Sequence, residues 1–140
     1  MKTRKRNMCP IVSTTIWLRT KKDQDLSRIS SILGVDGETR RIMDAPQVPK
    51  EFARSYWKLN RYAENVISIE EEIKTLLTPL CDKADIIHKL MEKEALKASV
   101  TVAIFFDRKK YLPMMVLGED TIRMMNALRV SEFSIDTFLY

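Results

Sequence analysis

Side chains of the types that carry catalysis or bind metals are few and scattered in this sequence. His88 is its only histidine, and Cys9 and Cys81 lie in no Cys-x-x-Cys pair and beside no histidine. Zinc sites gather several such ligands, and a nucleophilic side chain needs a base beside it. We therefore expect no catalytic residue, no metal ligand and no cofactor. We interpret both cysteines as reduced thiols of a cytoplasmic protein.

Acidic side chains offer one route to acid–base chemistry. A carboxylate cluster would form if the segments that carry four of them met in the fold: Asp107, Glu119, Asp120 and Asp136. Solvated charges at the ends of strands and helices are the simpler interpretation. The sequence also lacks the Gly-x-Ser-x-Gly elbow of hydrolases and the Gly-x-x-x-x-Gly-Lys phosphate loop. An enzyme with a pocket lined by perturbed acids stays open as an alternative.

Basic and aromatic side chains are better placed for recognition. Trp17 shares one face of a strand pattern with Arg19, whereas Arg40-Arg41 and Arg108–Lys110 lie in segments without periodicity. Exposed Trp and Arg side chains often anchor protein interfaces, and basic patches favour acidic partners. The candidate partner-binding residues are Trp17, Arg19, Arg40, Arg41, Arg108, Lys109 and Lys110.

The positive charge of the chain is concentrated at its start. Of the net charge of +5, four charges come from Lys2, Arg4, Lys5 and Arg6, which leaves +1 for the residues that follow. We expect residues 1–10 to be a basic, solvated and irregular tail, and residues 11–140 to form one domain. A tail of this charge also has the chemistry to contact nucleic-acid phosphates.

Alternation of apolar and other residues with a period of two predicts the strands that position these side chains. Residues 11–19 place Trp17 and Arg19 on one face of a first strand and apolar side chains on the other. Residues 98–107 are largely apolar on both faces, which predicts a central strand. This strand is also the candidate partner of a last strand at 133–140.

Helical spacing of apolar residues predicts four helices, at residues 26–33, 68–80, 82–94 and 119–128. A short strand is expected at 56–60, and a long polar loop at 34–55. Residues 111–117 read as extended, but Pro113 restricts them to an edge or irregular strand. The resulting order is β-α-β-α-α-β-β-α-β. It predicts an α+β fold with a mainly antiparallel sheet and helices packed on one face.

Length and composition agree with a folded, soluble chain. At 140 residues and 45% hydrophobic residues, the chain is long enough to bury a core without disulfides. No stretch approaches the roughly 18 apolar residues of a spanning helix, so we expect no membrane association. The first residues do not have the pattern of a signal peptide, because the apolar run after Arg6 is short and interrupted.

Several short motifs in a fixed order make the chain resemble a family of small bacterial proteins catalogued as domain of unknown function 4279. The resemblance spans about residues 11–140. Its marks are Ile32-Leu33-Gly34, Trp57-x-Leu59, the Ser68-x-x-Glu71 helix start, the strand Val100–Phe106 and the closing Ser134–Tyr140. The chain departs from the expected pattern in having only Gly118 before the last helix, and Phe138 in place of an acid.

What the resemblance implies concerns binding. The family supplies no catalytic residues to carry over, and small proteins of this kind look like the immunity partners found beside bacterial toxins. We therefore expect a non-enzymatic protein that binds and neutralises a toxin domain. Nucleic-acid binding through the basic tail and Arg108–Lys110 is the alternative.

Overall fold

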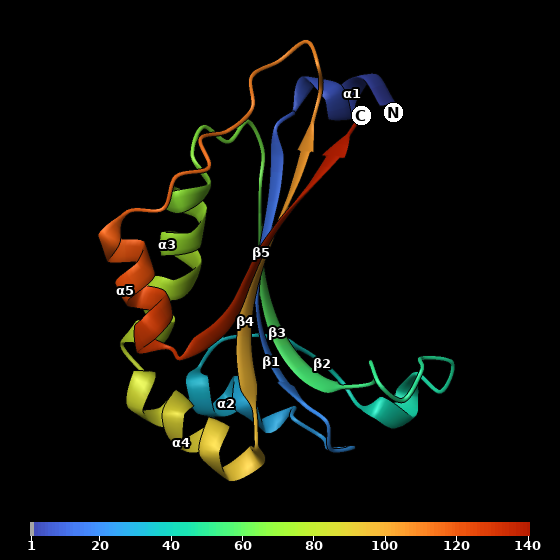
Figure 1. Cartoon of the computed structure of the whole chain (residues 1–140), viewed down its shortest axis with the longest axis vertical. Helices are drawn as coiled ribbons and strands as arrows, with labels where there is room; N and C mark the ends of the chain where they lie inside the picture. Colours follow the sequence, from blue (N-terminus) through green and yellow to red (C-terminus); the bar gives the residue numbers. More distant parts are fainter. Residues whose placement is uncertain (1) are drawn as a thin grey trace.

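A five-stranded sheet is the centre of the molecule, which a computed structural model describes over residues 2–140 (Figure 1). Its strands are β1 (Ile11–Thr20), β2 (Glu38–Arg40), β3 (Ser55–Ala63), β4 (Lys97–Phe106) and β5 (Val130–Leu139). They lie in the order β2-β3-β1-β4-β5. Every neighbouring pair is antiparallel except β4 and β5, which are parallel. The predicted α+β class with a mainly antiparallel sheet is confirmed.

The main helices lie on one side of this sheet, as predicted. Figure 1 shows α2, α3, α4 and α5 together on one face, while α1 lies beyond the end of the strands. The bounds are α1 (Lys2–Asn7), α2 (Arg28–Leu33), α3 (Ile69–Cys81), α4 (Ala84–Glu94) and α5 (Glu119–Ala127), with a short 3₁₀ helix η1 (Ile42–Asp44). No helix within residues 2–140 combines the length and apolar character needed to cross a membrane.

The core fills the space between the sheet and α2–α5. The even-numbered residues of β1 face the helices, and Val12, Ile16 and Leu18 are buried there. Helix α3 lays a stripe of isoleucine and leucine side chains against them, beginning at Ile69 and Ile73. Each such side chain contributes roughly 1.5–3 kcal/mol when it is removed from water. The helix-covered face therefore supplies the stability of the fold.

Strand β5 pairs along its length with β4, which confirms the pairing expected from the sequence. The register joins Val100 to Phe133 and Ile104 to Thr137, and the backbone N–H of Tyr140 extends it by donating to the carbonyl of Phe106 at 2.8 Å. Because the two strands are parallel, the chain must cross over between them, and α5 makes this crossover on the helix-covered face. Strand β5 forms one edge of the sheet.

Two extended segments differ from expectation. Residues 111–117 form no strand, because Pro113 has no N–H to donate. Their β-pairing is limited to the single bridge between Met114 and Ser68, and the Tyr111 hydroxyl also donates to the carbonyl of Asn65 at 3.1 Å. Conversely, the loop predicted at 34–55 contains the short strand β2, which pairs with β3. The Ser68 side chain makes no capping hydrogen bond, since that residue is held by the bridge instead.

The start of the chain is also more ordered than expected. Residues 2–7 form α1, and the carbonyls of Met8 and Pro10 accept hydrogen bonds from the backbone N–H groups of Asn65 and Val66 at 2.9 and 3.1 Å. Cys9 between them is fully buried. The predicted tail of residues 1–10 is thus tied down from Met8 onward. Met1 lies outside the described residues, as do the side chains of Lys2 and Thr3.

Candidate functional site

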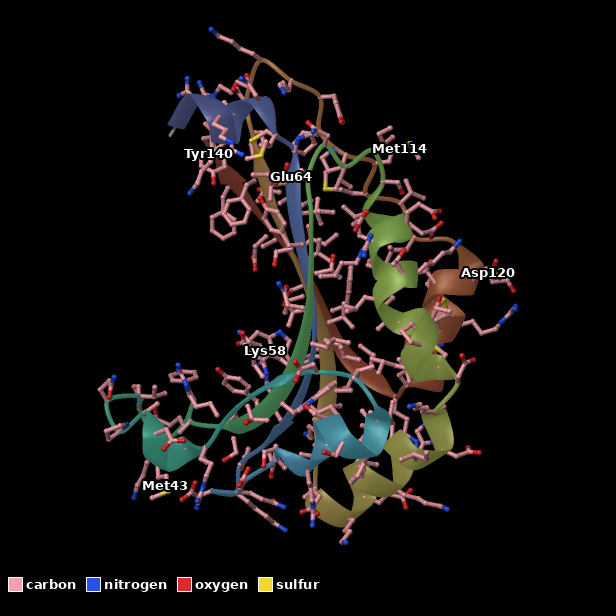
Figure 2. All side chains as sticks on the ribbon, turned by 180° about the vertical axis from the view of Figure 1, so that it is seen from behind. Met43, Lys58, Glu64, Met114, Asp120 and Tyr140 are labelled. Carbon is pink, nitrogen blue, oxygen red and sulfur yellow. The ribbon has the colours of Figure 1, made fainter. Side chains whose placement is uncertain are left out.

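The side of the sheet away from α2–α5 carries no helix layer, and we call it the open face. It presents the odd-numbered residues of β1 and β4 and the even-numbered residues of β3. Reading across the strands, one row is Tyr56, Arg19 and Lys97, and the next row is Lys58, Trp17 and Ser99. In Figure 2 the labelled Lys58 lies on this face, opposite the helix layer, in which the labelled Asp120 lies in the first turn of α5.

Five side chains at one end of the open face form a cluster of stacked cations and aromatic rings, which we call the cation–aromatic cluster: Trp17, Arg19, Arg40, Tyr56 and Lys58. The Arg19 guanidinium lies 4.3 Å from the centre of the Trp17 ring, and the Lys58 ammonium lies 4.9 Å from it. The Tyr56 ring meets Trp17 edge to face at 5.1 Å between centroids. Arg40 and Lys58 lie about 6 Å from the Tyr56 ring.

Strand geometry explains why these residues meet. Alternation along β1 turns Trp17 and Arg19 to the same face, and the antiparallel register sets Lys58 opposite Trp17 and Tyr56 opposite Arg19. The indole Nε1–H of Trp17 donates to the Thr101 hydroxyl at 2.9 Å, which fixes the ring against β4. The cluster is therefore built on rigid strands rather than on loops.

A small pocket adjoins the cluster. It has a volume of about 190 Å³ and lies between the cluster and the segment that follows β2. The walls contributed by that segment are largely apolar, including Ile42, Val48 and Phe52. Phe52 is 73% exposed, so a large apolar ring stands beside the basic and aromatic groups with little covering it. Such a combination is typical of protein interfaces.

The candidate binding residues separate into two groups. Trp17, Arg19 and Arg40 lie together in the cluster. Arg41 is close in sequence, but its guanidinium is paired with Asp23 at 3.4 Å. Arg108–Lys110 follow β4 at the opposite end of the sheet, about 30 Å away by the length of a ten-residue strand. One contiguous site containing all seven predicted residues is not formed.

The distant group lies beside α1. The Lys110 ammonium donates to the carbonyl of Asn7 at 2.6 Å, and the Lys109 N–H donates to the Asp107 carboxylate at 3.0 Å. Because α1 carries Arg4, Lys5 and Arg6, this end of the molecule is also strongly basic. Figure 1 shows α1 and the η1 segment at the two ends of the sheet, both projecting on the side of the open face.

The histidine and the two cysteines, which could in principle carry catalysis, have structural surroundings that do not favour it. His88 Nε2 contacts the carbonyl of Ala127 at 2.6 Å, at the end of α5. Burial raises the pKa of the Cys9 thiol, with the Asp107 charge acting in the same direction, and burial likewise raises the pKa of Cys81. Both thiols are therefore protonated near neutral pH and are poor nucleophiles.

The four acidic residues do not form a cluster. Glu119 and Asp120 are exposed at the start of α5, and both pair with Arg123, at 2.8 and 3.7 Å. In the described part of the chain, no group of three or more His, Cys, Asp or Glu side chains has the geometry to hold a metal ion. Asp107, Glu119 and Asp120 lie at the ends of elements as interpreted, whereas Asp136 is exposed within β5.

Tyr56 and Lys58 are the cluster members that lie outside the set of binding residues predicted from the sequence. The signal was present in part, because Trp57 and Leu59 in the predicted strand point toward the core, so alternation turns their neighbours to the other face. The sequence did not indicate that β3 pairs with β1, and this pairing brings the two side chains to Trp17.

Comparison with known proteins gives one match. A family model described as "Domain of unknown function (DUF4279)" matches residues 13–140, nearly the whole chain. Neither the curated proteins nor the solved structures contain a significant match. The match covers β1 from its third residue and the other four strands completely, and it includes every residue of the cation–aromatic cluster.

Proposed function

The chain belongs to the DUF4279 family, and we propose that it is a non-enzymatic binding protein that covers part of a partner protein with its open face. The partner we propose is a toxin domain with an acidic surface, so that the chain acts as an immunity protein in the bacterial cytoplasm. The resemblance to immunity partners motivates the choice of a toxin. The geometry of the open face motivates the choice of surface.

The observation that carries the proposal is the cation–aromatic cluster. Trp and Tyr supply large, rigid contact area, and Arg supplies directed hydrogen bonds, which is why these residues dominate interface energetics. Trp17, Tyr56 and Arg40 lie on regular strands, and none of their rings or guanidinium groups is covered by the helix layer. Little conformational entropy is lost when a preformed cluster of this kind binds.

Charge supports an acidic partner. The cluster is basic at one end of the open face, and α1 with Arg108–Lys110 is basic at the other end. Two basic regions about 30 Å apart fit within one side of an interface of standard size, which covers about 800 Å² per partner. Positive potential at both ends would speed association with an acidic protein and fix its orientation.

The direct test is binding to the protein encoded beside this gene. We expect the purified chain to bind that neighbour and to inhibit its toxicity. We expect Trp17→Ala to weaken binding by about 2 kcal/mol, roughly 30-fold in Kd. Arg40→Gln should slow association and make it less sensitive to salt. Calorimetry and stopped-flow association at two salt concentrations measure both effects.

Lys93→Gln is the matched control. Lys93 is exposed on α4 in the helix layer, and its substitution removes the same single charge as Arg40→Gln. It should leave both affinity and association rate nearly unchanged. The proposal is wrong if the neighbouring protein is neither bound nor inhibited, or if Lys93→Gln weakens binding as much as the open-face variants do.

A specific observation also favours nucleic-acid binding as a second candidate. Arg4, Lys5 and Arg6 on α1 lie beside the Arg108–Lys110 turn, which gives six basic residues at one end of the sheet. Phosphate contacts of this kind predict steep weakening of affinity with salt and loss of binding when residues 1–6 are deleted. A fluorescence titration that detects no affinity for nucleic acid at low salt would dismiss this candidate.

A further inference from the structure

A second pocket of the described chain lies beside the cluster but is chemically different from it. It has a volume of about 520 Å³ and is formed where the end of β1, the start of β4 and the start of β5 meet Arg54. We propose that this basic pocket binds a phosphate dianion, either free or as the terminal group of a small phosphate monoester. The proposal requires no protein partner and stands apart from the function proposed above.

Positive charge dominates the walls. Five cationic side chains line the pocket against a single acid, Glu132: Arg19, Lys21, Lys22, Arg54 and Lys97. Within residues 4–140, none of the five takes part in an ion pair. Like charges gathered without counterions repel one another, and a bound anion removes that repulsion. A dianion neutralises more of the excess positive charge in the pocket than a single carboxylate does.

Ser99 supplies an independent observation. It lines the pocket, it is only 6% exposed, and its hydroxyl oxygen has no hydrogen-bond partner in the protein. Buried hydroxyl groups are nearly always hydrogen-bonded, so one without a partner needs an explanation. The oxygen itself is closed to solvent, so the side chain must turn toward the pocket before a phosphate oxygen there can accept from this hydroxyl group.

The arginines are held in place before any ligand arrives. The Arg19 guanidinium is stacked on the Trp17 ring at 4.3 Å. Arg54 donates to the carbonyls of Glu51 and Ala53 at 3.1 and 2.6 Å. Burial lowers the pKa of Arg19, Glu132 raises it and Arg54 lowers it further, yet a guanidinium remains charged at neutral pH. Guanidinium groups fixed in this way match the geometry of phosphate oxygens.

The neighbouring apolar pocket gives an ester room for its organic part. Arg19 and Arg54 line both pockets, so the phosphate site adjoins the pocket that contains Phe52 and Val48. The volume of the basic pocket falls in the range of small-ligand sites. An organic group attached to the phosphate would extend into the apolar pocket.

The test is a titration of the protein alone with inorganic phosphate at low ionic strength, followed by calorimetry and tryptophan fluorescence. Trp17 touches Arg19 and should respond, whereas Trp57 is fully buried in the core. We expect saturable binding that Lys97→Gln weakens about tenfold. Potassium acetate at the same ionic strength should give no saturable signal. A nucleoside monophosphate that binds more tightly than phosphate would identify the ester as the source, and equal affinities would identify free phosphate.

Ser99→Ala and Thr14→Val form a matched pair of variants. Both hydroxyl groups are buried without a partner, so each substitution should leave the stability unchanged or raise it. Thr14 lies on the helix-covered face, so only Ser99→Ala should weaken phosphate binding. No saturable binding by millimolar phosphate, equal binding of acetate, or affinity unaffected by both Lys97→Gln and Ser99→Ala would each overturn the proposal.

Discussion

The two faces of β1 differ in kind although they share one backbone. Residues that point toward the helices, such as Ile16 and Leu18, are almost completely buried. Residues that point the other way, such as Trp17 and Arg19, are half-buried and stack on one another rather than in a core. The helix-covered face accounts for stability, and the open face keeps large aromatic and basic side chains accessible. Substitutions on the two faces should therefore have different consequences.

Removal of β5 should have the largest effect on stability, because both faces of the sheet lose a strand. Deletion of residues 133–140 leaves β4 without its parallel neighbour and uncovers the buried Val100, Val102 and Ile104 at a new edge. We expect no cooperative thermal transition by circular dichroism. Deletion of residues 1–6, which removes most of α1 but no core residue, should retain the transition. A cooperative transition in the first deletion would show that β5 is dispensable.

The two tryptophans provide the sharpest contrast between the faces. Trp57 is completely buried, and its indole N–H donates to the Ser30 hydroxyl at 2.9 Å. Trp57→Ala should cost about 3–5 kcal/mol of unfolding free energy, because a cavity remains where a large side chain was packed. Urea denaturation measures this cost, with an unchanged m-value as the control for a two-state comparison.

Gly37→Ala should also destabilise the covered face, by a smaller amount. A Cβ at this position would lie 2.3 Å from the Trp57 ring, closer than packing allows. Overpacking of this kind costs about 1–3 kcal/mol. The double variant with Trp57→Phe tests the cause, since a smaller ring gives the new methyl group room. Its total cost should then be less than the sum of the two single costs.

On the open face, Trp17→Ala should cost about 1 kcal/mol or less of unfolding free energy. The ring is half-buried and its lost contacts are mainly a cation–π stack, an edge-to-face pair and one hydrogen bond. The same variant is expected to have a large effect on partner binding. Equal destabilisation by Trp17→Ala and Trp57→Ala in urea would contradict the division between the faces.

The smallest expected effect concerns pH. The pKa of Glu70 is held below its usual value of 4.5, chiefly because the backbone N–H of Gly118 donates to its carboxylate, and the Lys74 charge acts in the same direction. A lowered pKa in the folded state means that this contribution is present at neutral pH and is lost as the pH falls below about 4.5. Glu70→Gln should reduce the loss of unfolding free energy between pH 7 and pH 3, measured by urea unfolding. The same substitution at the exposed Glu71 should leave this pH dependence unchanged.

The sequence predicted those elements whose own side chains carry a periodic apolar pattern. Strand β4 is apolar on both faces, and this pattern indicated its interior position and its partner β5, although the central strand of the sheet is β1. Strand β2 was missed because its three residues are all exposed and show no apolar alternation. Residues 111–117 have the composition of a strand, but without a donor at Pro113 they make only one bridge.

Of the candidate site, the sequence pattern predicted which residues of a single strand share a face, but not which strands lie side by side. Alternation within β1 identified Trp17 and Arg19 as one face, and the structure places them in the cluster. The strand order was not derivable from the sequence, so neither the addition of Tyr56 and Lys58 nor the separation of Arg108–Lys110 was predictable. The basic pocket was missed for the same reason, because its walls come from distant segments that meet only through strand pairing.

Strand β5 leaves one edge of the sheet unpaired, with ten residues whose backbone groups would suit another strand. Its only charged side chains are Glu132 and Asp136, in a chain that is otherwise basic. If the β5 edges of two copies met in antiparallel fashion about Ser134, each Glu132 would stand opposite an Asp136, and like charges in that position repel. These two acids thus disfavour edge-to-edge pairing of two copies in that register, an effect that neither the core nor the open face provides.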